Sequence, residues 1–138
     1  MASLPAATAA AHNPQLVQLT RFIKAAGMTN MLNSAKAITI FAPDNAAFVA
    51  LGQGNLTTLL ASKSDLTKVL EYQVAIGRHT PADFANREHL TTLQGTAVLP
   101  AQPGRHWYIV NNADVVCGNI QTANATIYIV DRVLVPLR

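Results

Sequence analysis

The spacing of apolar residues changes from helical to alternating about two thirds of the way along the chain. Before this point they recur three or four positions apart, which places them on one face of a helix. From residue 90 onward, short β-prone runs are separated by turn-forming residues, as expected of successive strands. Helices followed by strands predict an α+β domain built mainly from antiparallel strands, with several short helices in its N-terminal half.

The clearest predicted helix begins at Asn13-Pro14, where a capping residue precedes a proline in the first turn. Its apolar stripe comprises Leu16, Leu19, Ile23 and Ala26, with Phe22 beside it, and Gly27 ends it. A second short helix or turn is expected from Met28, Met31 and Leu32. Residues 1–11 are rich in alanine and show no pattern. We therefore expect a flexible N-terminal segment ahead of one domain at 12–138.

A compact β-prone run over residues 38–42 predicts a strand. It should end at Pro43, because proline cannot donate a hydrogen bond to a neighbouring strand. Asp44 or Asn45 can then cap a short helix that carries Phe48 inward. We expect Pro43 and Asn45 to have structural roles.

Two further helices and five strands complete the prediction. A weak helix follows Asn55, and a stronger one runs over residues 64–77 with apolar side chains at helical spacing. The expected strands are 90–93, 96–99, 107–110, 113–116 and 126–135. Turns are expected at 94–95, 100–104, 111–112 and 118–119.

Composition narrows the class of protein. The chain has 138 residues, of which 50% are hydrophobic and 12% charged, so it can bury a core and is too apolar to be disordered. The net charge is +3, but the ten lysines and arginines are scattered and no nucleic-acid-binding motif accompanies them. No apolar run approaches the roughly 20 residues of a membrane-spanning helix. We expect neither nucleic acid nor a bilayer span among its interactions.

The residues that could carry chemistry do not form a recognised motif. The four histidines lack the close spacing of zinc ligands, and no nucleophile elbow, phosphate loop or dinucleotide fingerprint is present. We therefore expect no metal, no cofactor and no enzymatic activity. The single cysteine, Cys117, is expected to be buried and inert, or else half of a bridge whose partner is missing.

Two polar residues, one in the last predicted strand and one just before it, are expected to be structural. By alternation, Asp131 shares a face with apolar residues, so its carboxylate should be buried and accept backbone N–H bonds from a loop, near the turn at 43–45. Asn124 begins one of two glycosylation acceptor patterns, the other starting at Asn55. We expect Asn124 to bond to the backbone rather than to carry a glycan.

Five segments, taken together, resemble the fasciclin domain family. The two longest are 39–48 (TIFAPDNAAF) and 124–136 (NATIYIVDRVLVP). Three shorter ones are 70–77 (LEYQVAIG), 92–95 (TLQG) and 111–118 (NNADVVCG), the last resembling secreted bacterial members, notably mycobacterial ones. The resemblance covers residues 12–138. It implies a wedge-shaped pair of β-sheets with several small helices, and adhesion at cell surfaces or in extracellular matrix.

The resemblance also implies candidate partner-binding positions. It places Tyr72 and Gln73 at an adhesion-linked surface, where Gln73 replaces the family's usual histidine, although a packing role for Tyr72 stays open. An Asp-Ile pair that some animal members use to contact integrin corresponds here to Asn119 and Ile120, without the carboxylate. Trp107 is a further candidate, because tryptophan is favoured at interface hot spots.

The leading hypothesis is a non-enzymatic adhesion module, secreted or in the cell envelope after removal of a signal that this chain does not contain. Its partner would be a cell-surface or matrix protein or a polysaccharide, and weak self-association is a further expectation. The alternative is a carrier or sensor of a small apolar ligand, held in a cleft between sheet and helices. Saturable binding without turnover would favour the first, and a bound small mass in native mass spectrometry the second.

Overall fold

The computed structural model describes residues 4–52, 54, 58, 61–79, 90–93, 95, 97–98, 100–104, 107–111 and 113–134. Its helices are α1 (Ala6–Ala11), the 3-10 helix η1 (Pro14–Leu16), α2 (Val17–Ala26), α3 (Thr29–Ser34), α4 (Asn45–Leu51) and α6 (Lys63–Tyr72). Its strands are β1 (Ile38–Pro43), β2 (Val74–Ile76), β3 (Leu90–Thr91), β4 (Ala97–Val98), β5 (Pro100–Gly104), β6 (Trp107–Val110), β7 (Ala113–Gln121) and β8 (Ala125–Val130). The α+β class is confirmed.

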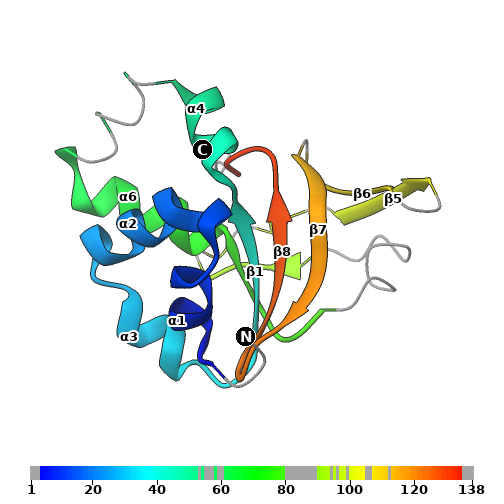
Figure 1. Cartoon of the computed structure of the whole chain (residues 1–138), viewed down its shortest axis with the longest axis horizontal. Helices are drawn as coiled ribbons and strands as arrows, with labels where there is room; N and C mark the ends of the chain where they lie inside the picture. The colour runs from blue at the N-terminus through cyan, green and yellow to red at the C-terminus, as the bar shows by residue number, and fades with distance from the viewer. Residues whose placement is uncertain are drawn as a thin grey trace.

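Six strands form a mixed sheet in the order β2-β1-β8-β7-β6-β5. The central pair, β1 and β8, is parallel, and the other neighbours are antiparallel. Strands β3 and β4 form a separate two-stranded sheet, which reaches β2 through a bridge between Ala75 and Thr92. Figure 1 shows the helices gathered on one side of the molecule and the β5–β6 hairpin projecting on the other.

The central strands β1 and β8 are buried along their whole length. Alternate side chains enter two cores: Ile40 and Ile127 pack with the helices, while Phe41 and Tyr128 pack on the opposite face of the sheet. Strands covered on both faces are apolar throughout rather than alternating. This explains why both signature segments contain continuous apolar runs.

Several local signals act as predicted. Asn13 accepts a bond from the Gln15 N–H at 2.9 Å, and Gly27 ends α2 in the left-handed conformation, with φ of 71°. Strand β1 ends at Pro43, and the Asp44 carboxylate then caps α4 by accepting from the Ala47 N–H at 2.8 Å. These contacts join neighbours in sequence, so the residue types alone predict them.

Asn45 has a structural role of longer range. Its side-chain oxygen accepts from the Gln18 N–H at 3.1 Å, and its amide donates to the Pro14 carbonyl at 2.9 Å. It therefore joins the start of α4 to the start of the first long helix.

Four boundaries were predicted wrongly. The strand expected over 126–135 ends at Val130. The helix expected to reach residue 77 ends at Tyr72, because the next residues pair with β1 as strand β2. The turn expected at 100–104 is strand β5, whose two prolines are tolerated because β5 lies at the edge of the sheet. The turn expected at 118–119 lies within β7, where a Cβ on Gly118 would stand 3.0 Å from the Tyr128 ring. The helix expected after Asn55 lies mostly outside the described residues.

Candidate functional site

Tyr72 and Gln73 are both buried, with 2% and 1% of their surface exposed. The Tyr72 hydroxyl accepts a bond from the Asn111 amide at 2.9 Å. The expectation that these two side chains form a partner-binding surface is therefore wrong for this structure, and the burial supports the packing role for Tyr72.

Gln73 joins two distant parts of the chain. Its amide nitrogen donates to the Val69 carbonyl at 2.9 Å and to the Leu134 carbonyl, and its oxygen accepts from the Leu134 N–H at 3.1 Å. Both backbone groups of Leu134 are thus paired with one side chain inside the protein. Such pairing holds the segment after β8 against the end of α6.

Asn124 connects the β7–β8 turn to the helices. Its oxygen accepts from the Ala6 N–H at 2.9 Å, and its nitrogen donates to the carbonyls of Leu32 and Ala35, each at 2.8 Å. This confirms the expectation that Asn124 bonds to the backbone. The Asn55 pattern lies outside the described residues.

The N-terminal segment is more ordered than its composition suggests. Residues 6–11 form helix α1, and its alanines at positions 6, 7, 9 and 10 are buried. The residue before the helix is Pro5, whose side chain cannot cap it. Instead, Asn33 accepts from the Ala7 and Thr8 N–H groups at 2.8 and 3.3 Å, and Asn124 accepts from that of Ala6. Capping from distant residues corrects the expectation of a flexible segment.

Trp107 is accessible among the candidates whose side chains the structure describes. Its side chain is 52% exposed, and its indole N–H donates to the Asp114 carboxylate at 2.8 Å. The register pairs Ile109 with Asp114, so alternation places Trp107, Ile109, Asp114 and Val116 on one side of the β6–β7 hairpin. We call this surface the Trp107 face. Val116 is 55% exposed, whereas Tyr108 and Val115 pack against the core on the other side.

Asp131 bonds to the backbone of Asp114, a residue of the Trp107 face. Its carboxylate accepts from the Asp114 N–H at 2.8 Å, and its own N–H donates to the Asp114 carbonyl at 3.0 Å. The carboxylate is half-buried and follows the last residue of β8, so the expectation of a fully buried acceptor inside the strand is wrong. The nearby 43–45 turn meets the same strand end, where the Asp44 N–H donates to the Val130 carbonyl at 3.0 Å. The chain of contacts Asp131–Asp114–Trp107 fixes the orientation of the indole.

Changing Asp131 to alanine is expected to lower the free energy of unfolding by about 0.5–1 kcal/mol, because the exposed Asp114 N–H loses a charged acceptor that water replaces only in part. Asp131→Asn keeps an acceptor oxygen and should lose less than half as much. Chemical denaturation of the two variants measures the difference. Equal stability of the wild type and Asp131→Ala would show that Asp114 is held by its strand pairing alone.

Asn119, Ile120 and Cys117 lie on β7. Ile120 is half-buried against the helical core and pairs with Ile127, so only part of its side chain is accessible to a partner. The Asn119 side chain lies outside the part of the chain that the structure describes. Cys117 is exposed, which corrects the expectation of a buried thiol. It lies one strand out from the buried central pair, between two register shifts.

Asp114 and Val116 were missed from the sequence. A usable signal was present, because the turn predicted at 111–112 implies that Val110 pairs with Ala113, which is the register that the structure shows. If that register is continued along the hairpin, Trp107 lies opposite Val116.

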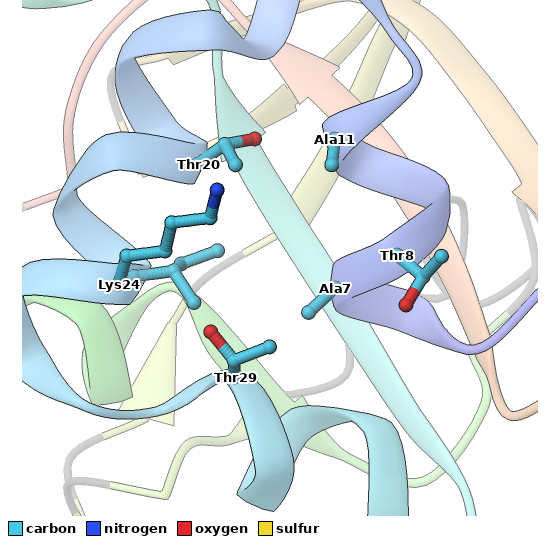
Figure 2. A pocket seen from close by; sticks show the side chains of 7 residues that line it. Ala7, Thr8, Ala11, Thr20, Lys24 and Thr29 are labelled. Atoms are coloured by element: carbon cyan, nitrogen blue, oxygen red, sulfur yellow. The ribbon is translucent and has the colours of Figure 1, made fainter.

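A hollow of about 150 Å³ lies among α1, α2 and α3. Figure 2 shows Lys24 extending along it from α2, opposite Ala7 and Ala11 of α1. The alternative hypothesis placed a ligand cleft between sheet and helices, whereas this hollow lies among helices.

The described ranges contain neither a metal-binding cluster nor a membrane-spanning helix. Within them, no group of three histidine, cysteine, aspartate or glutamate residues is placed to hold a metal ion. No helix in the same ranges combines the length and hydropathy that crossing a membrane requires.

Comparison with known proteins identifies the family. A fasciclin domain model matches residues 14–136. Immunogenic protein MPB70 of Mycobacterium bovis is 40% identical over 141 residues, covering 99% of this chain and 71% of that protein. Cell surface glycolipoprotein MPB83 of the same species is 38% identical over 141 residues, covering 99% of this chain and 62% of that protein.

A solved FAS1 domain pair from the insect cell adhesion molecule fasciclin I matches the fold with a TM-score of 0.73. The two share 19% sequence identity over 88% of this chain and 45% of that one, so this likeness concerns the fold alone. The family model and the mycobacterial relatives extend over nearly the whole chain and fit a cell-surface adhesion-type module. The chain belongs to the fasciclin domain family, whose members are generally non-enzymatic adhesion modules.

Proposed function

We propose that this domain acts as an adhesion module, secreted or in the cell envelope, and that it binds a protein partner through the Trp107 face. The observation that carries the proposal is the exposed indole of Trp107, held in place by Asp114 at 2.8 Å. Tryptophan is enriched among the few residues that dominate binding energy at interfaces. An indole that is already oriented loses less conformational freedom on binding than a mobile side chain.

The surroundings of the indole favour a protein over a polysaccharide. Val116 lies on the same face with 55% of its surface exposed, and Ile109 is half-buried beside it. Aliphatic groups beside an aromatic anchor form the apolar centre that protein interfaces contain. One carboxylate oxygen of Asp114 is already paired with the indole.

Trp107→Ala is expected to weaken binding at least tenfold, as for an interface hot spot. The measurement is saturation binding of the folded domain to cells of its own host and to panels of matrix proteins and polysaccharides, with heat-unfolded protein as the background. Binding to a polysaccharide alone would overturn the choice of a protein partner, and an unchanged affinity in Trp107→Ala would overturn the choice of face.

Two valines provide a matched control. Val116 on the Trp107 face and Val17 at the start of α2 have nearly equal exposed fractions, 55% and 50%. Val116→Ala should weaken binding, whereas Val17→Ala should leave it unchanged, and thermal melts confirm that both variants fold. Sedimentation of the free domain at increasing concentration tests whether a second copy is itself a partner.

A further inference from the structure

The hollow among α1, α2 and α3 is mainly apolar and is bordered by one lysine. Its apolar lining comes from Ala7, Ala11 and Ile23, and three threonines, at positions 8, 20 and 29, add methyl and hydroxyl groups. The volume of about 150 Å³ is similar to that of engineered apolar cavities that bind benzene. A ligand that fills it therefore has an apolar body of only a few carbon atoms.

One cation borders this apolar space. Lys24 lies in the last turn of α2 and is exposed, and Figure 2 shows its amine directed along the hollow toward Thr20. Among the described contacts, no hydrogen bond or ion pair occupies this amine. An ammonium group strengthens any hydrogen bond that it donates to an anion.

The threonine hydroxyls differ in how they are used. The Thr20 hydroxyl donates to the Leu16 carbonyl at 3.0 Å, and that of Thr8 accepts from the Asn33 amide at 3.2 Å. Figure 2 shows the Thr29 hydroxyl on the side that faces Lys24. Lys24 can thus donate to the head group of a ligand while the alanines line the space for its apolar body.

We propose that this hollow binds a small apolar monocarboxylate, with the carboxylate at Lys24 and the hydrocarbon part between α1 and α2. Charge complementarity selects the acid over its neutral analogues, and the hollow has room for only a few carbon atoms of the hydrocarbon part. The proposal is independent of the adhesion function, because no residue of the Trp107 face takes part.

The test uses benzoate and benzamide, which have nearly the same shape and differ in charge. In an NMR titration of the whole chain, benzoate should shift the backbone amide signals of Thr8, Thr20 and Thr29. It should bind about tenfold more tightly than benzamide, because the charge-assisted bond is the stronger one. Decanoate, which carries the same head group on a long chain, should bind no more tightly than benzoate.

Three variants locate the effect. Lys24→Met should remove the preference for benzoate over benzamide, while Arg21→Met, which removes an exposed cation one turn earlier on α2 and outside the hollow, should keep it. Ala11→Leu adds carbon atoms at an exposed position that lines the hollow, and should weaken both ligands. Equal affinities for benzoate and benzamide in the wild type, or an unchanged preference in Lys24→Met, would overturn the proposal. Shifts confined to residues far from the hollow would do the same.

Discussion

Replacing Asn124 with alanine is expected to lower the free energy of unfolding by about 3–4 kcal/mol, near the upper end for a single substitution. The side chain makes one accepted bond to Ala6 and donated bonds to the carbonyls of Leu32 and Ala35. Each partly buried backbone group that loses its partner costs about 1 kcal/mol or more. The partners lie at the start of α1 and at the C-terminal end of α3, so the loss loosens the junction of these two helices with the β7–β8 turn.

Asn30 provides the control for this prediction. It is exposed on α3, the helix whose end Asn124 contacts, and Asn30→Ala should change stability by less than about 0.5 kcal/mol. Asn124→Asp separates the two halves of the junction, since the carboxylate can still accept from Ala6 but cannot donate to the carbonyls. Chemical denaturation gives the stabilities, and amide exchange at Ala6 reports the attachment of α1. If Asn124→Ala is as stable as Asn30→Ala, burial of the alanines alone holds α1 in place.

What the sequence predicted well depends on short-range contacts. The helix start at Asn13, the helix stop at Gly27 and the cap at Asp44 each involve groups within a few residues of one another. Their residue types therefore determine the local structure regardless of the rest of the fold. The continuous apolar runs of β1 and β8 were recognisable for a related reason, because burial on both faces leaves no polar alternation.

What the sequence did not predict depends on distant partners. Helix α1 receives its capping bonds from Asn33 and Asn124, which are 26 and 118 residues from the N–H groups they accept from. Nothing in the alanine-rich segment itself indicates these partners. Strand β2 was mistaken for helix for the same reason, since its hydrogen bonds go to β1, more than 30 residues earlier.

The candidate site divides in the same way. Trp107 was found by residue type. The hairpin register could have added Asp114, because the two residues lie on adjacent strands of one hairpin. The burial of Tyr72 and Gln73 could not be found, since it results from the Leu134 region packing over them, some 60 residues later in the sequence. Family position placed these residues at a binding surface, whereas the structure shows both of them buried.

Gln73→Ala is expected to lower the free energy of unfolding by about 2–4 kcal/mol, because it leaves both backbone groups of Leu134 without partners in a buried environment. The substitution should also loosen the segment after β8 locally. The segment after β8 is held to α6 through this side chain, so amide exchange at Leu134 should quicken more than exchange in β1. Gln15→Ala, at an exposed position in η1, should leave both measurements unchanged.

The variant Gln73→His tests why an amide occupies a position where the family usually carries histidine. The glutamine makes three bonds, donating to Val69 and Leu134 and accepting from Leu134. A neutral imidazole has one donor and one acceptor, so it can keep at most two of the three. We therefore expect Gln73→His to lie between the wild type and Gln73→Ala in stability, with Leu134 exchange in the same order. If the alanine variant matched the histidine variant in both measurements, packing of the C-terminal segment rather than the amide would be what holds Leu134 in place.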